Sequence, residues 1–363
     1  MRGGMRRALL LALGCVLLLQ PAAAQETTAP RSELSSQLDR DRALVGTIWS
    51  AREKRRIGRD ELIDALAKSP IVLLGEVHDN ADHHRLRASL IGTLASRRKS
   101  AQAGARAGEG TPAIVGPAVV FEHIRANQQP LVDAYVSLLR ETPEEAAAGL
   151  MTQLQWERSG WPPAALFAPL FEEAFRHRLP ILGGNTPTEL IRKVGRGGLT
   201  ALADEERNRL GLDVLLESPL QQALVAEIEA SHCGLLPESA FLPMALAQQY
   251  RDAQLADTLL TALENHGAAI LVAGNGHVRA DRGVPWRLRQ RAPMISVVTV
   301  AFIEVDNKQD DPATYVMMGP DGEAAVDYVW LTPRAERPDP CEKMRQGFGK
   351  AAPQSQSGAA EKR

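Results

Sequence analysis

Histidine and acidic side chains gather directly after four short apolar runs of the chain. A carboxylate beside an imidazole suits general-base activation of water, and neutral imidazoles also bind metal ions. The apolar runs are residues 71–74, 118–121, 180–183 and 268–273. The polar residues that follow them are Glu76, His78, His83, His84, Glu122, His123, Asn185, Asn275, His277 and Arg279.

These apolar runs predict the strands that position the polar residues. Residues 71–74 are aliphatic at every position, which is typical of a strand buried on both faces, and residues 295–305 predict a fifth strand. Helical patterns lie between the runs, so we expect an α/β fold with a mostly parallel central sheet and helices on both faces. Because ligands bind at the carboxyl ends of parallel strands, the four polar segments should form one site.

The remaining segments predict a single domain over residues 41–340 with flanking extensions. Glycine, alanine and charged residues predict a surface loop at 97–117, and helical patterns predict insertions that form a cap. We further expect a flexible segment at 25–40, a helix at 44–55, helical insertions at 127–178 and 186–265, and a disordered tail at 341–363.

The beginning of the chain predicts export. Arginines precede the apolar run Ala8 to Leu19, and the small residues that end at Ala24 predict a signal peptide over residues 1–24. A lipoprotein anchored at Cys15 is the alternative, and it fits less well because Ala12 occupies the usual leucine position. We expect a periplasmic or secreted protein with no transmembrane segment in the mature chain.

Cleavage after Ala24 would leave two cysteines, Cys233 and Cys341. Paired cysteines are usual in an oxidising compartment, so the sequence favours a disulfide between them. The alternative is two unpaired, buried thiols.

Charge and composition narrow the class of protein. The 363 residues include 42 Lys and Arg against 44 Asp and Glu, which gives a net charge of −2. A nucleic-acid-binding protein should be basic, so this class is disfavoured. The 44% hydrophobic and 24% charged residues are typical of a globular protein.

Chemistry alone leaves the role of the expected site open. A metal ion would be held by His78, His83 and His277, although the chain has no H-E-x-x-H, C-x-x-C or H-x-H spacing. A hydrolase would use Glu76, His78, Glu122 and His277. Taken singly, each residue could instead cap a helix, pack on the core or belong to an ordinary loop.

The same segments resemble a known family. The sequences LLGEVHDNADHH (73–84), VVFEH (119–123) and LVAGNGHVRADRGVPWRL (271–288) are similar to the ChaN-like haem-binding uptake proteins. That family is a branch of a superfamily with the Tiki and TraB proteins and the erythromycin esterases. The resemblance covers residues 71–305 and implies an α/β sheet with helical insertions.

The family resemblance implies an exported protein of iron acquisition. It further implies haem bound at a homodimer interface through tyrosine and histidine. Of the four tyrosines, Tyr250 in the expected cap is the candidate haem ligand, with a partly buried helix residue as the alternative. The ligand-binding set is then completed by His83, His84, His123, Asn185, Asn275 and Arg279.

The superfamily implies a second interpretation, a periplasmic hydrolase. Tiki-like proteins cleave peptides with a divalent metal ion, and erythromycin esterases activate water with Glu and His residues. Glu76, His78, Glu122 and His277 would carry either reaction. The family resemblance therefore implies haem as the cofactor, with a divalent metal ion as the alternative.

Overall fold

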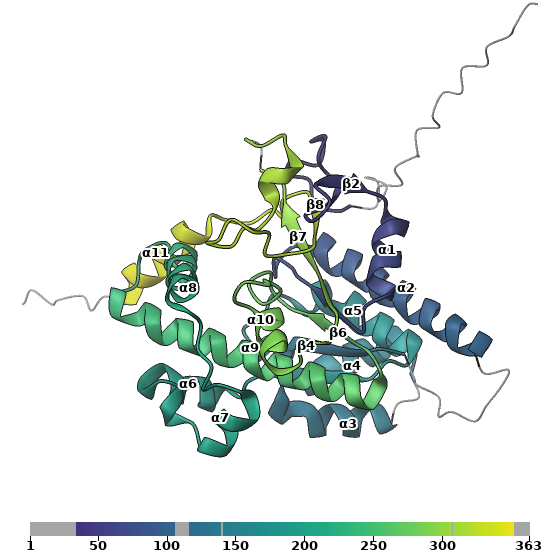
Figure 1. Cartoon of the computed structure of the whole chain (residues 1–363), viewed down its shortest axis with the longest axis horizontal. Coiled ribbons are helices and arrows are strands. Elements are labelled where there is room, and N and C mark those ends of the chain that lie inside the picture. Colours follow the sequence, from purple (N-terminus) through teal and green to yellow (C-terminus); the bar gives the residue numbers. More distant parts are fainter. Residues whose placement is uncertain (1–33, 106–115, 139–140, 307, 352–363) are drawn as a thin grey trace, which may run out of the picture.

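The computed structural model describes residues 34–105, 116–138, 141–306 and 308–351 (Figure 1). The expected signal peptide and Cys15 lie outside these residues. Within the described ranges, no helix is long and apolar enough to cross a membrane.

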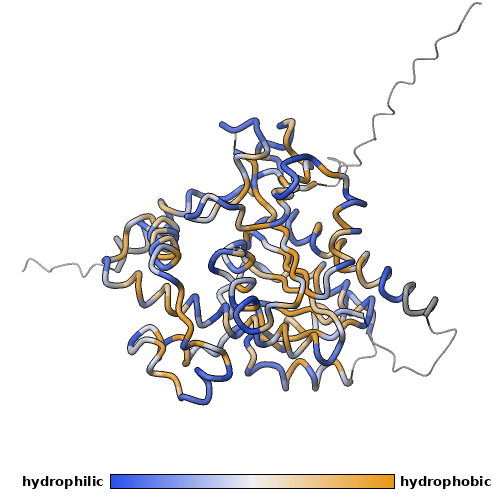
Figure 2. The backbone as a smooth tube through the Cα atoms, in the orientation of Figure 1, coloured by the Kyte–Doolittle hydropathy of each residue, from blue (hydrophilic) through white to orange (hydrophobic). Residues whose placement is uncertain are grey.

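An eight-stranded sheet forms the centre of the molecule, in the order β2-β1-β8-β7-β3-β6-β4-β5. The strands from β8 to β5 are parallel, and β1 pairs antiparallel with both β8 and β2. The middle of the molecule is correspondingly hydrophobic in Figure 2. The strands are β1 (Ile48–Ser50), β2 (Arg55–Ile57), β3 (Ile71–Leu74), β4 (Ala118–Arg125), β5 (Ile181–Asn185), β6 (Ala269–Val272), β7 (Val297–Glu304) and β8 (Tyr328–Thr332).

Helices cover the sheet in two groups (Figure 1). In the first group α2 packs on α1 and α5, and α4 packs on α5. In the second, α9 packs on β4, β5 and β6, and α6, α7, α8 and α10 pack on α9. The helices are α1 (Arg59–Ala67), α2 (Ala81–Ala105), α3 (Gln129–Leu138), α4 (Pro143–Gln153), α5 (Ala164–His177), α6 (Thr188–Gly197), α7 (Asp204–Leu210), α8 (Ser218–Ser231), α9 (Glu238–His266), α10 (Val284–Arg291) and α11 (Pro340–Ala351).

The pleat of β4 shows that the two groups lie on opposite faces of the sheet. The ring of Phe121 stacks on Phe171 of α5, with ring centres 4.4 Å apart. A Cβ on Gly184 would lie 2.6 Å from Val120 and 2.7 Å from Leu255 of α9, so Val120 faces α9. Successive residues of a strand face opposite ways, which confirms the expected α/β fold with helices on both faces.

The predicted strands at residues 71–74, 118–121, 180–183, 268–273 and 295–305 are confirmed as β3 to β7. The predicted helix at 44–55 is wrong, because this segment forms β1, a turn and the start of β2. Ile48 pairs with Trp330 of β8 and is 1% exposed. A sheet contact distant in sequence therefore decides the local structure.

Three boundary predictions also need correction. Of the expected flexible segment 25–40, residues 25–33 lie outside the described ranges, and the part from residue 34 packs on the domain. Leu34 is 4% exposed, and the backbone amides of Ser35 and Ser36 donate to Asp82. The expected loop at 97–117 begins as helix, because α2 continues to Ala105. The expected disordered tail begins with α11.

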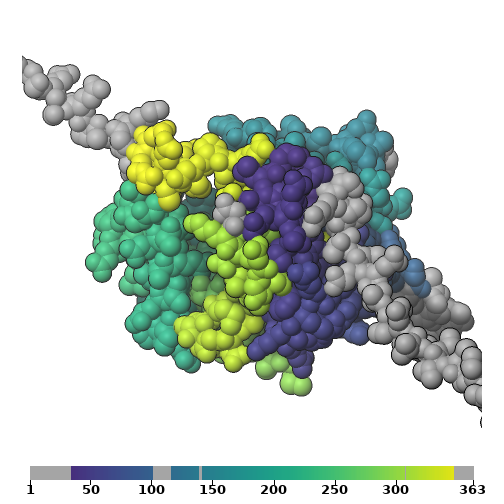
Figure 3. Space-filling view, turned by 90° about the horizontal axis from the view of Figure 1, so that it is seen from above, coloured from purple at the N-terminus to yellow at the C-terminus, as the bar shows by residue number. Residues whose placement is uncertain are grey.

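The predicted disulfide between Cys233 and Cys341 is present. It joins the turn after α8 to α11, and the C-terminal segment lies against the residues of the cap in Figures 1 and 3. The bond spans 108 residues of sequence. Closing a loop of that size in the unfolded chain stabilises the fold by roughly 4–5 kcal/mol at most.

Candidate functional site

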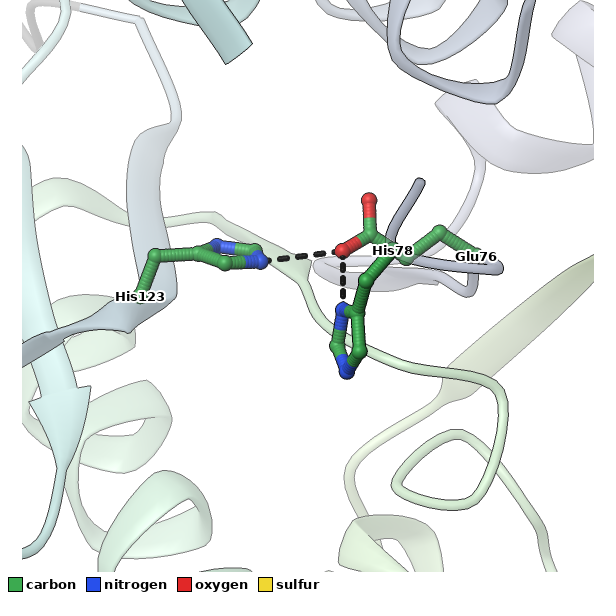
Figure 4. Close-up of side chains that lie close together, drawn as sticks. All are labelled: Glu76, His78 and His123. Carbon is green, nitrogen blue, oxygen red and sulfur yellow. Dashed lines mark hydrogen bonds and ion pairs between the residues drawn. The ribbon is translucent and has the colours of Figure 1, made fainter. Parts of the chain in front are cut away.

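A buried carboxylate, Glu76, is the centre of the first group of polar side chains, beyond the carboxyl end of β3. Its Oε1 accepts hydrogen bonds from Nδ1 of His78 at 2.6 Å and Nε2 of His123 at 2.9 Å (Figure 4). Its Oε2 forms an ion pair with Arg87 and lies 3.1 Å from Nδ1 of His84. We call these five residues the Glu76 cluster.

Three elements deliver the Glu76 cluster. Glu76 and His78 lie in the segment that leaves β3, and His123 belongs to β4. His84 and Arg87 lie three residues apart on α2 and therefore share one face of that helix. Asn80 caps α2, because its Oδ1 accepts from the backbone amides of Asp82 and His83.

Burial keeps the inner histidines of the Glu76 cluster neutral. It lowers the pKa of His84 to about 4 and holds the pKa of His123 well below its ordinary value. Burial also lowers the pKa of Arg87 to about 9, which leaves this guanidinium charged at pH 7. The cluster therefore contains one ion pair, Glu76 with Arg87, beside the uncharged imidazoles of His84 and His123.

His78 is the accessible member of the Glu76 cluster. Its side chain is 39% exposed, whereas those of Glu76, His84, Arg87 and His123 are fully buried. The indole of Trp161 packs beside His78 with ring centres 5.0 Å apart. A ligand from solvent would therefore meet His78 and Trp161 first.

Glu122, the residue before His123 on β4, is the centre of a second group of polar side chains. Glu122 accepts from the backbone amide of Gly274 at 2.8 Å and lies 3.2 Å from Nε2 of His277. Nδ1 of His277 donates to Asp252 of α9 at 2.6 Å. Glu122, Asp252 and His277 form what we call the Glu122 cluster.

The imidazole of the Glu122 cluster is charged. Burial alone would lower the pKa of His277, but Glu122 and Asp252 outweigh it and raise the pKa to about 10. The pKa of Glu122 is held well below its ordinary value against the effect of burial, because His277 stabilises its carboxylate form. His277 is thus a cation between two acidic side chains.

Gly274 separates the two clusters. A Cβ at this position would lie 3.0 Å from Cε1 of His78 and 3.7 Å from Oε2 of Glu122. The absence of a side chain lets His78 approach the backbone that Glu122 holds.

The structure therefore brings together six of the predicted site residues, in two adjoining groups. Glu76, His78, His84 and His123 share the first cluster, and Glu122 and His277 share the second.

His83 lies outside both clusters. Its Nδ1 accepts from the backbone amide of Val77 at 2.9 Å, and its Nε2 donates to Thr332 at 2.7 Å. It is fully buried, and burial lowers its pKa to about 3. Both ring nitrogens of His83 are engaged in holding the fold, so the predicted metal set of His78, His83 and His277 does not meet at one ion.

The two predicted asparagine ligands brace the strand ends. Asn185 donates to the carbonyl of Glu122 at 2.8 Å, and Asn275 donates to the carbonyl of Phe302 at 2.8 Å.

The other two predicted ligand-binding residues, Arg279 and Tyr250, also have partners outside the two clusters. Arg279 forms a two-fold hydrogen bond with Asp281, at 3.0 and 2.8 Å. Tyr250 is fully buried within the cap and donates to Glu206 at 3.1 Å, away from the cluster residues. The structure therefore supplies no contact between Tyr250 and the site.

Sequence reasoning missed Arg87 and Asp252. Each lies on a helical stripe of buried residues, Arg87 with Ile91 and Leu94 on α2, and Asp252 with Ala256 on α9. A charged residue that interrupts an apolar stripe at spacings of three and four signals a buried polar partner.

The Glu76 cluster has atoms placed for a metal ion. One ligand atom each from Glu76, His78 and His123 lies within 4.8 Å of the others. Three protein ligands with an open side resemble a catalytic metal site. Binding there would replace both hydrogen bonds to Glu76, whereas binding at Nε2 of His78 would keep them. The residues therefore fit a single ligand at His78 with less rearrangement.

The fold and these clusters define an α/β protein with a histidine- and glutamate-rich site at the carboxyl ends of its strands. A family model described as haem-binding uptake, Tiki superfamily, ChaN matches residues 62–288. The chain belongs to this family, as the sequence resemblance predicted.

A solved structure with a similar fold supports this architecture, and two further structures match more weakly. A structure describing cofacial haem binding to ChaN of Campylobacter jejuni is 18% identical, covers 78% of this chain and 95% of its own, and gives a TM-score of 0.57. The type III effector HopBA1 is 14% identical, covers 76% and 92%, and scores 0.38. A succinoglycan biosynthesis protein is 14% identical, covers 68% of each chain and scores 0.33. No curated protein sequence matches the chain.

Proposed function

We propose that this protein is exported and binds haem for iron acquisition, with Nε2 of His78 as the iron ligand. The observation that carries the proposal is the state of His78: half-exposed, with its other ring nitrogen bonded to the buried carboxylate of Glu76. Metal-binding histidines commonly donate their second N–H to a carboxylate, which fixes the tautomer and raises ligand basicity. Bound haem would supply the iron that the protein carries.

The surroundings of His78 also suit a large, flat ligand. Trp161 offers an aromatic wall beside the imidazole, and Gly274 leaves the backbone uncovered on another side. Arg87 balances the charge of Glu76, so the carboxylate stays ionised and keeps accepting from His78. These residues orient the imidazole before the ligand arrives.

Export and dimerisation complete the proposal. The signal-peptide pattern of residues 1–24 and the disulfide between Cys233 and Cys341 are consistent with an oxidising compartment. Because His78 offers one side of the iron, we propose that a second copy of the chain covers the other face of the haem. Light scattering of haem-loaded protein should then give the mass of a dimer.

A haemin titration tests the proposal. The chain without residues 1–24 should shift the Soret band of haemin at one equivalent, and His78→Ala should abolish the shift while the far-UV spectrum stays unchanged. His266→Ala, at the end of α9, is the matched control and should bind as the parent does. A parent spectrum identical to free haemin, or an unaltered His78→Ala variant, would refute haem ligation at this residue.

A metal-dependent or Glu/His-dependent hydrolase is the second candidate. It is favoured by the close ligand atoms of Glu76, His78 and His123 and by the buried chain from Glu122 to Asp252. Elemental analysis should then find a divalent metal ion, or a panel of esters and peptides should show turnover that Glu76→Gln and His277→Ala remove. Folded protein with neither metal nor turnover would count against it.

A further inference from the structure

The helical cap contains a cavity that the proposed haem site does not use. Its volume is about 530 Å³, within the range of small-molecule sites, and it is lined by α8, α9 and the segment before α10. Part of the wall is apolar, from Leu224, Ile228 and Met244. The rest carries polar and charged side chains, among them Glu227, Gln248, Arg251, Asp252 and Arg282.

Two arginines of the cavity wall have unused hydrogen-bond donors. The Nε atoms of Arg251 and Arg282 are buried and donate to no residue in the described part of the chain. The side chain of Arg282 is 7% exposed, although its terminal nitrogens pair with Asp281 and Glu227. Arg251 forms no ion pair with any residue that the structure describes. A buried donor without an acceptor costs free energy, so an acceptor supplied by a ligand would stabilise these groups.

One arginine of this wall has no carboxylate partner. Glu227 pairs with Arg282, and Asp281 pairs with both Arg279 and Arg282. Arg251 keeps its charge available to an occupant of the cavity, because no described carboxylate pairs with it. Guanidinium groups bind carboxylate and phosphate through paired, charge-assisted hydrogen bonds, so Arg251 favours an anion.

The remaining acid on the wall, Asp252, has a partner outside the cavity. It accepts a hydrogen bond from Nδ1 of His277 in the Glu122 cluster. Gln248 also contacts the His277 ring, with its Nε2 3.2 Å from Nδ1. An occupant of the cavity would thus lie behind the Glu122 cluster, on the α9 side of the sheet.

We propose that the cap cavity binds a small amphiphilic anion, a molecule with one carboxylate or phosphate group and a short apolar body. The anionic group lies at Arg251 and Arg282, and the apolar body lies against Leu224, Ile228 and Met244. This binding site is separate from the one at His78 and does not depend on haem binding.

Calorimetric titration of the whole mature chain tests the cavity. Hexanoate and hexyl phosphate are the probes for the two head groups, and hexan-1-ol is the uncharged control. At least one anion should bind, and the alcohol should bind at least ten-fold more weakly. Arg251→Gln should weaken anion binding about ten-fold or more, and Met244→Trp, which fills the cavity, should abolish it.

Arg192→Gln, an exposed arginine of α6, is the matched control and should bind the anions as the parent does. Absence of binding by both anions, equal binding of the alcohol, or unchanged binding in both cavity variants would overturn the proposal. The haemin titration of Arg251→Gln should match the parent. Failure at the cavity and failure at His78 are therefore measured separately.

Discussion

The Glu76 and Glu122 clusters use the same residue types but hold their histidines in opposite charge states. In the Glu76 cluster, burial keeps His84 and His123 neutral, because Arg87 already balances the carboxylate. In the Glu122 cluster, two acidic side chains keep His277 charged in spite of burial. Burial disfavours the charged imidazole in both clusters. The number of opposite charges around each histidine therefore decides whether it is protonated.

This difference separates two roles at one edge of the sheet. An imidazole binds iron or another metal through an unprotonated ring nitrogen. Among the described cluster residues, the half-exposed histidine is His78 of the Glu76 cluster. A histidine that carries protons on both nitrogens cannot act as a ligand, so His277 fixes Glu122 and Asp252 instead. The pleat of β4 makes the separation possible, because the neighbours Glu122 and His123 face opposite sides of the sheet.

The largest expected effect comes from removing the cation of the Glu76 cluster. Arg87→Met would leave the buried carboxylate of Glu76 without its ion pair, which typically costs about 3–5 kcal/mol. Urea denaturation followed by circular dichroism should show this loss. Arg97→Met on the same helix, where the ion pair with Asp64 is exposed, should cost less than about 1 kcal/mol.

A double substitution sharpens this first prediction. Glu76→Gln together with Arg87→Met removes both charges and should cost less than Arg87→Met alone, because no unpaired ion remains. Equal losses for Arg87→Met and Arg97→Met would show that Glu76 is not the charge that Arg87 balances.

Removing the cation of the Glu122 cluster should lower the stability of the fold by an amount that depends on pH. His277→Gln would leave Glu122 and Asp252 without their shared partner, at a cost of about 3 kcal/mol near pH 6. The pKa of His277 rises from an ordinary 6.5 to about 10 on folding. Its contribution is therefore complete below pH 6.5 and is lost as the pH rises through 10.

Urea midpoints at pH 6, 7.5 and 9 measure this trend. The difference in urea midpoint between the parent and His277→Gln should become smaller as the pH increases. The corresponding difference between the parent and His266→Gln should not. A gap for His277→Gln that stays constant over this range would mean that His277 is neutral in the folded protein.

The sequence predicted the parts of this architecture that depend on local pattern. Continuous apolar runs gave β3 to β7, and the rule that parallel strands end at one edge brought Glu76, His123 and His277 to neighbouring positions. The separation of Glu122 and His123 into different clusters was not predicted. The strand was expected to end at Phe121, whereas β4 continues to Arg125 and turns these two neighbours to opposite faces.

The predictions that were wrong or incomplete concern residues whose partners are distant in sequence. Residues 44–55 have a helical pattern but are held by β8, and His83 looks like a ligand but is bonded to Thr332. Arg87 and Asp252 lie within helices and were not among the predicted site residues. Only the packing of α2 and α9 on the sheet turns these two side chains inward.

Acid should destabilise the protein through the neutral histidines of the Glu76 cluster. The pKa of His84 falls from an ordinary 6.5 to about 4 on folding. Its contribution to stability is fully present above pH 6.5, and about 3 kcal/mol of it is lost as the pH falls through 4. In His84→Gln the urea midpoint should change less between pH 7 and pH 4.5 than it does in the parent. An identical acid response in both proteins would indicate that His84 does not titrate as proposed.

The smallest effect should come from closing the gap between the clusters. Gly274→Ala places a Cβ 3.0 Å from Cε1 and 3.2 Å from Nε2 of His78, which is tighter than an ordinary contact. Because His78 is half-exposed, its ring can move by a few tenths of an ångström, so the loss of stability should be about 1 kcal/mol or less. The ring would then be displaced from Glu76, and the haemin titration should show weaker binding than in the parent.

Gly276→Ala, where a Cβ meets no atom closer than 3.8 Å, is the control and should bind haemin normally. If Gly274→Ala binds haemin as tightly as Gly276→Ala, the position of His78 against Gly274 does not matter for the ligand, and haem ligation would have to be sought at another residue.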